Sequence, residues 1–225
     1  MKITYERTYN RYAINNNNHQ GCYEKILHRI YIHTKDMLIR HNKVLTLRFD
    51  LRTSTEEGCS YLDSKKIDRF IENIIVDLMR NNPLPEEGKK KSTRKNISRH
   101  RVDPRIIIVV EENDYEKPHA HCIILVNGNA KRCPMDILKR IERQYKNVLK
   151  EEYREGLVNY CNQLGKNSYM LERDDEKTLN KFFYQASYLA KVRGKDRREK
   201  GLWIVRGTRI PSKNGKSIPV GIKYS

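Results

Sequence analysis

The chain has 225 residues, which is ample for one well-buried α/β domain and short for two, so we expect a single domain with appended segments. Its 46 lysines and arginines against 28 acidic residues give a formal net charge of +18, which predicts a polyanionic partner. No stretch approaches the roughly 20 apolar residues that span a bilayer, and residues 1–12 lack the apolar core of a signal peptide, so we expect no membrane partner.

The cysteines predict free thiols in a reducing cytoplasm. They are odd in number, widely spaced and without the CxxC pair that marks a zinc ribbon or a redox centre. They are Cys22, Cys59, Cys122, Cys133 and Cys161.

Apolar periodicity predicts a helix, a strand and a second helix in the first part of the chain. Residues 20–40 carry apolar side chains mostly three, four or seven apart, as in an amphipathic helix, after a polar loop at 15–18. Residues 44–52 (VLTLRFDLR) suit a strand with one face on the core. A second helix spans 65–80 and ends before two prolines. Its apolar stripe consists of Ile67, Phe70, Ile71, Ile74, Ile75, Leu78 and Met79.

Residues 86–105 are almost wholly polar and strongly basic. Two interpretations remain open: a solvated loop, or a contact with the DNA backbone that becomes ordered on binding. The candidate DNA-binding residues here are Lys89, Lys90, Lys91, Arg94 and Lys95.

The sequence pattern of the second part of the chain predicts a β-hairpin followed by helices and short strands. The β-rich runs 105–112 and 119–127 read as adjacent central strands of one sheet. A helix over 134–150, a short strand at 156–161, a helix over 174–192 and a strand at 202–206 follow. We expect an N-terminal basic segment with its amphipathic helix at 1–43, a main domain at 44–211 that includes the basic loop, and a basic tail at 212–225.

Two histidines in the second hairpin strand form a candidate metal site. His119 and His121 lie two apart, so both imidazoles project from one face of the strand and can share a cation. Two histidines on a strand face are also common without a metal, as ordinary core or surface residues.

The third ligand is expected from the neighbouring strand. Glu111 and Glu112 end that strand, and because neighbours in a strand face opposite ways, one of them can point at the cation. The sequence does not show the hairpin register, so the alternation of side chains along the strand cannot decide which glutamate faces the cation. Both could instead simply cap an exposed strand end.

A second constellation lies in the helix predicted over 174–192. Tyr184, Tyr188 and Lys191 fall four and three apart, so that two phenols and an ammonium would share one helical face. The alternative is an aromatic stripe that faces the core, since the neighbouring apolar residues also need burial.

The two constellations together resemble a known family. PHAH in a hydrophobic strand, followed about 60 residues later by YLAK, resembles the HUH endonucleases, whose motifs are His-hydrophobic-His and Tyr-x-x-Lys. Ala120 is a mild departure at the hydrophobic position. More narrowly, KPHAHCIILVN and FFYQASYLAK look like the replication initiators of filamentous bacteriophages and related prophage proteins, over roughly 45–211.

The resemblance implies an α+β fold: a palm-like central antiparallel sheet with flanking helices, the His motif on a central strand and the tyrosine helix packed across it. VLTLRFDL resembles the family's first strand. The spacing of eight residues before the His motif favours Glu111 over Glu112 as the third ligand.

The resemblance also implies the chemistry. Tyr188 would attack a scissile phosphate of single-stranded DNA, Lys191 would stand beside it, and Tyr184 could serve a second transfer. The cofactor would be a divalent metal, Mn²⁺ or Mg²⁺. The partners would be a replication origin, expected to form a hairpin, and the helicase and polymerase of a bacterial host in whose cytoplasm the protein acts. The product, a 5′-phosphotyrosine and a free 3′-hydroxyl, would start rolling-circle replication.

Two alternatives stay open. A transposase or plasmid relaxase of the same group would perform the same chemistry for another purpose. A non-enzymatic basic regulator that binds nucleic acid would explain the charge equally well and leave the paired motifs unexplained.

Overall fold

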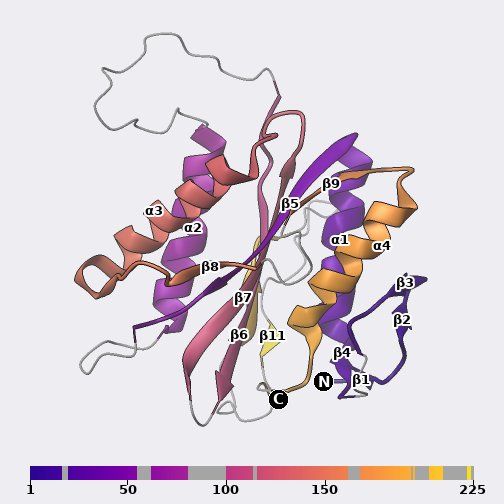
Figure 1. Ribbon diagram of the computed structural model, residues 1–225, viewed down its shortest axis with the longest axis horizontal. Coiled ribbons are helices and arrows are strands. Elements are labelled where there is room, and N and C mark those ends of the chain that lie inside the picture. The colour runs from indigo at the N-terminus through magenta and orange to yellow at the C-terminus, as the bar shows by residue number, and fades with distance from the viewer. Residues whose placement is uncertain are drawn as a thin grey trace.

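A central antiparallel sheet of seven strands organises the molecule (Figure 1). The computed structural model describes residues 1–16, 20–54, 62–80, 100–113, 116–161, 168–193, 195, 203–209 and 222–223, without the side chains of 112–118, 203–204 and 222–223. The strand order is β11-β10-β6-β7-β5-β8, with β9 also paired to β5. The strands are β5 (Lys43–Leu51), β6 (Arg105–Asn113), β7 (Glu116–Asn127), β8 (Val158–Tyr160), β9 (Ser168–Glu172), β10 (Trp203–Gly207) and β11 (Ile222–Lys223).

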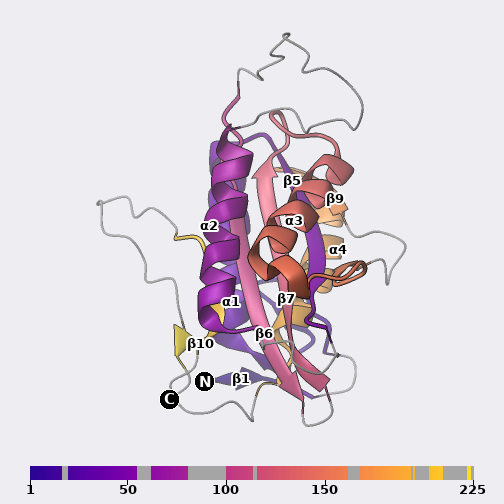
Figure 2. The same ribbon diagram turned by 90° about the vertical axis from the view of Figure 1, so that its left-hand side faces the viewer.

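Helices cover both faces of this sheet. Helices α2 (Ser64–Arg80) and α3 (Pro134–Leu149) lie on one face, which Figure 2 turns toward the viewer. Helices α1 (Glu24–Arg40) and α4 (Glu176–Ala186) lie on the other, as Figure 1 shows edge-on. The predicted α+β class, with a large antiparallel sheet and flanking helices, is therefore confirmed.

Short elements complete the chain. Four two-residue strands, β1 (Ile3–Thr4), β2 (Thr8–Tyr9), β3 (Tyr12–Ala13) and β4 (Cys22–Tyr23), form two small antiparallel pairs near the N-terminus, β1 with β4 and β2 with β3. Two 3₁₀ turns, η1 (Lys150–Glu152) and η2 (Ser187–Ala190), follow α3 and α4.

Strand β5 shows why the sheet has two cores. Its odd-numbered residues Leu45, Leu47, Phe49 and Leu51 belong to the core under α2 and α3, whereas Val44 belongs to the core under α1 and α4. The expectation of a strand with one buried face was wrong, because eight of its nine residues are buried. Because side chains alternate between the two faces of a strand, Thr46, Arg48 and Asp50 lie on the α1 and α4 side with Val44. These three side chains are buried although they are polar.

The other predicted elements are found with shifted ends. The β6–β7 hairpin occupies the predicted central position, and β8 and β10 match the two predicted short strands. The helix predicted over 20–40 begins at Glu24, because Cys22 and Tyr23 pair with β1. Met79 was assigned to the buried stripe of α2 but is 66% exposed. Strands β1–β4, β9 and β11 were not anticipated.

The cysteines that the structure describes are free: Cys22, Cys122 and Cys161 are buried, and Cys133 is exposed. Cys59 lies outside the described residues. Among the described residues, no helix combines the length and apolar character needed to cross a membrane.

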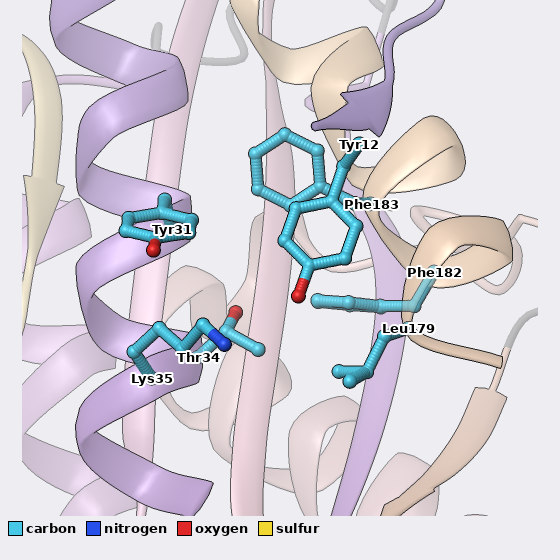
Figure 3. Close-up of a pocket in the computed structure, with 7 residues that line it drawn as sticks. All are labelled: Tyr12, Tyr31, Thr34, Lys35, Leu179, Phe182 and Phe183. Atoms are coloured by element: carbon cyan, nitrogen blue, oxygen red, sulfur yellow. The ribbon is translucent and has the colours of Figure 1, made fainter. Parts of the chain in front are cut away.

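A small pocket lies between α1, β3 and α4 (Figure 3). Aromatic rings from Tyr12, Tyr31, Phe182 and Phe183 line it, and the Lys35 ammonium lies 5.9 Å from the ring centroids of both tyrosines. No histidine or acidic residue is among its lining residues, so it is distinct from the cluster described next.

Candidate active site

The hairpin register brings three potential ligands onto one face of the sheet. Glu111 on β6 is paired directly with His119 on β7, and His121 is paired with Val109 two residues before Glu111. Directly paired residues project to the same face, as do residues two apart. Glu111, His119 and His121 each offer a ligand atom, and these atoms all lie within 4.8 Å of one another.

This donor set fits a divalent cation. Metal–nitrogen and metal–oxygen distances of about 2.0–2.2 Å require ligand atoms roughly 3–4 Å apart, so small side-chain rotations would complete the site. Two imidazoles and one carboxylate suit zinc, iron or manganese, and tolerate magnesium less well. The side chain of Glu112, the other candidate, lies outside the described residues.

His121 is held between two carboxylates. Its Nδ1 lies 2.7 Å from Oδ1 of Asp50 on β5, and its Nε2 lies 2.9 Å from Oε2 of Glu111. Burial by itself would lower the pKa of His121, but these two hydrogen bonds outweigh it and raise the pKa above its ordinary value. The Asp50 contact orients the ring so that Nε2 faces the cluster, as carboxylates behind metal-ligating histidines do.

The carboxylates of the cluster are held ionised. Burial would raise the pKa of Glu111, but the hydrogen bond from His121 and the charge of Lys195 bring it down to about 2. The Lys195 ammonium, fully buried, lies 3.3 Å from Oε2 of Glu111. For Asp50, burial is likewise outweighed by the bonds to His121, and the pKa is lowered. Glu111 is therefore available to a cation over the whole physiological pH range.

Tyr188 completes the cluster. Its ring meets the His121 imidazole edge to face, with centroids 5.1 Å apart. The Arg48 guanidinium carbon lies 4.2 Å and the Lys191 Nζ 4.8 Å from the Tyr188 ring centroid. Burial, with the negative charge of Glu111, raises the pKa of Tyr188, so the phenol is neutral in this state. Burial also lowers the pKa of Lys191.

The α-helix that precedes Tyr188 ends earlier than predicted. The α-helix begins after the cap Asp175, whose side chain accepts a hydrogen bond from the Thr178 amide, and it ends at Ala186. The Ser187 hydroxyl donates to the Tyr184 carbonyl at 2.8 Å, a local bond that competes with the α-helical ladder. The chain tightens into η2, and Lys191 leaves it with extended backbone to pair with Cys22.

The predicted single helical face is consequently wrong. Tyr184 is half-buried within α4, Tyr188 belongs to η2, and Lys191 follows η2, so the three residues do not share one α-helical stripe. The Tyr188 ring joins this segment to His121, and Lys191 lies beside Tyr188.

Three residues of the cluster were missed by sequence reasoning. Arg48 and Asp50 had a signal, since they are charged residues in a largely apolar strand, but that signal does not identify their partners. Lys195 had none, because it lies within a run of basic residues. The candidate DNA-binding residues Lys89, Lys90, Lys91, Arg94 and Lys95 lie outside the described residues.

Comparison with known proteins identifies the family. No curated protein matches the chain. A crystal structure of the non-structural protein 1 N-terminal origin-recognition/nickase domain from human bocavirus is 12% identical, with 78% of this chain and 70% of that chain covered, but its TM-score of 0.15 is too low to support any inference. The family model of the YagK/YfjJ C-terminal domain matches residues 4–201. The chain therefore belongs to the YagK/YfjJ C-terminal domain family.

Proposed function

We propose that this protein is a metal-dependent endonuclease of the HUH type, which uses Tyr188 to cut and rejoin single-stranded DNA at a replication origin. One observation carries the proposal: the Tyr188 ring packs against His121, a member of the cluster that can hold a cation. A nucleophile and a cation site in contact are the two parts that tyrosine-mediated phosphoryl transfer needs.

The residues of the cluster have separate roles in this proposal. Glu111, His119 and His121 would hold the cation, and Asp50 orients His121. A divalent cation bound there would supply positive charge to the scissile phosphate. Lys191 adds a second positive charge next to Tyr188, where negative charge accumulates during attack.

The chemical step transfers the phosphoryl group of the DNA from a 3′ oxygen to Tyr188. The Tyr188 Oη forms a bond to phosphorus while the bond from phosphorus to the 3′ oxygen breaks. The phenolic proton passes to solvent, and the departing 3′ oxygen takes up a proton. Only about one phenol in a thousand is ionised at neutral pH, a deficit of about 4 kcal/mol that the positive charges around Tyr188 must offset.

The product retains the energy of the broken ester in a 5′-phosphotyrosine. Attack by a 3′-hydroxyl on this linkage reverses the reaction and joins strands, while the free 3′-hydroxyl left by the cut can prime rolling-circle replication. Host helicase and polymerase would complete that cycle in the bacterial cytoplasm. The net charge of +18 supports a nucleic-acid substrate.

A covalent adduct is the direct test. The full chain is mixed with Mn²⁺ and with 3′-labelled single-stranded oligonucleotides that tile both strands of the DNA flanking its own gene. The proposal predicts a labelled, protein-linked band on a denaturing gel, with the label on a peptide that contains Tyr188. DNA binding without an adduct from any oligonucleotide would instead support a non-enzymatic binding protein.

A further inference from the structure

Arg48 is a buried cation that forms no close salt bridge with the described residues. It lies on β5, two residues before Asp50 and on the same face of the sheet, and its side chain is 4% exposed. A buried guanidinium is costly unless it is paired and hydrogen-bonded. Within the described part of the chain, its Nε has no hydrogen-bond partner.

The one ion pair of Arg48 among the described residues is weak. Its Nη2 lies 3.9 Å from Oδ1 of Asp50, beyond hydrogen-bonding distance, and that same oxygen is already 2.7 Å from Nδ1 of His121. The charge of Arg48 helps to lower the pKa of Asp50, but this oxygen forms its hydrogen bond with the histidine, so no hydrogen-bonded salt bridge holds the guanidinium in place.

The close partner of Arg48 is the Tyr188 ring. The guanidinium carbon lies 4.2 Å from the ring centroid, well within cation–π distance, while the His121 imidazole meets the same ring edge to face. Side chains from β5 and β7 therefore contact the Tyr188 ring, which η2 carries.

We propose that Arg48 is a positioning residue for the tyrosine attack: its guanidinium, stacked on Tyr188, fixes the ring against His121 so that the phenol faces the metal cluster. This inference rests on the proposed function. Arg48 exchanges no proton or electron in the step. An apolar side chain could fill the same volume without the cost of burying a charge, so simple packing does not account for the arginine.

The test uses variants of the full chain. Arg48→Met keeps the length of the side chain and removes the charge, and Arg48→Lys keeps the charge and removes the planar group that stacks. Arg52→Gln, at an exposed position just after the same strand, is the matched control for the loss of one positive charge. Single-turnover adduct formation with Mn²⁺ and the labelled oligonucleotide that reacts with the wild-type chain gives the rate and the DNA dissociation constant separately.

We expect Arg48→Met to slow adduct formation at saturating DNA by about 100-fold, as misplacement of a reacting group by an ångström does. The DNA dissociation constant of Arg48→Met should equal that of Arg52→Gln. Arg48→Lys should form the adduct at a rate between those of Arg48→Met and Arg52→Gln. Relaxation of ¹³C-labelled tyrosine rings, with the Tyr188 signal assigned by Tyr188→Phe, should show the Tyr188 ring more mobile in both Arg48 variants and the Tyr145 ring unchanged. If Arg48→Met does not fold, the adduct-formation rate and the Tyr188 ring mobility of Arg48→Lys test the positioning role.

Two failures are distinguishable. No adduct from the wild-type chain would overturn the proposed function and, with it, this role for Arg48. A wild-type adduct, with Arg48 variants that react at the rate of Arg52→Gln or keep the Tyr188 ring as ordered as in the wild type, would overturn the inference about Arg48 alone.

Discussion

The aromatic ring of Tyr188 stands perpendicular to the imidazole of His121, at an interplanar angle of 89° and a centroid distance of 5.1 Å. This contact joins the end of the α4 segment to the central strand β7. It places a phenol at the cluster of side chains that could hold a metal ion, and most of the predictions below depend on it.

The contact predicts which tyrosine attacks. Tyr188→Phe keeps the ring and its packing but removes the nucleophilic oxygen, so we expect no covalent DNA adduct. Tyr184→Phe, its matched control one helical turn earlier, should form the adduct at nearly the wild-type rate. Denaturing gels with labelled single-stranded DNA measure both. An adduct from Tyr188→Phe that disappears only in the double variant would mean that the two phenols are interchangeable.

Removal of a metal ligand should separate cleavage from DNA binding. His119→Ala and His121→Ala each remove one of three candidate ligands, and we expect both to abolish the adduct at limiting Mn²⁺ while the +18 charge keeps DNA affinity largely intact. EDTA should have the same effect on the wild type. A histidine variant that cleaves at the wild-type rate in limiting Mn²⁺ would exclude the proposed metal site.

Asp50 should control metal affinity through His121. Asp50→Asn keeps the shape of the side chain but loses the charge that holds Nδ1 of His121, so Mn²⁺ should bind about 10- to 100-fold more weakly. Isothermal titration measures the affinity, and excess Mn²⁺ should restore much of the cleavage. Asp174→Asn, at an exposed turn, is the control. Equal affinities for both variants would show that Asp50 does not support the site.

The low pKa of buried His33 predicts that the protein loses stability in acid. Burial, with the charges of Arg29, Arg105 and Arg40, lowers its pKa from 6.5 to about 3. Between these values the unfolded chain binds more protons than the folded one, so this contribution to stability is complete above about pH 6.5 and is lost as the pH falls toward 3. From pH 7 to about pH 4.5 the loss should be about 2–3 kcal/mol.

Urea denaturation of His33→Leu tests this. The free energy of unfolding of the variant should fall less than that of the wild type over the same pH interval. His28→Leu, on the exposed face of the same helix, is the matched control. Parallel pH profiles for wild type and His33→Leu would contradict the assignment of a buried neutral imidazole.

The basic segment remains a prediction from sequence. Neutralising Lys89, Lys90, Lys91, Arg94 and Lys95 together should weaken DNA binding and flatten its dependence on salt, because each lost phosphate contact releases about one counterion fewer. Binding isotherms at several salt concentrations give the slope. An unchanged slope would indicate a solvated loop.

The sequence by itself determined most of the longer helices and strands, and it singled out candidate site residues. Periodicity is a local property, so it located α1, α2, α3 and the β6–β7 hairpin to within a few residues. His119 and His121 were placed on one face of a strand by spacing alone. The same local reasoning extended the Tyr188 helix too far, because the bond from Ser187 to the Tyr184 carbonyl leaves no trace in a hydrophobic pattern.

Only the tertiary structure decided how these elements meet. The hairpin register set Glu111 opposite His119, and a shift by one residue would have turned it away. The pairing of β5 with β7 brought Asp50 to His121, and the return of the chain after η2 brought Lys195 to Glu111. Such contacts join residues far apart in the chain, and they form because two helix layers bury both faces of the sheet; no pattern within one segment encodes them.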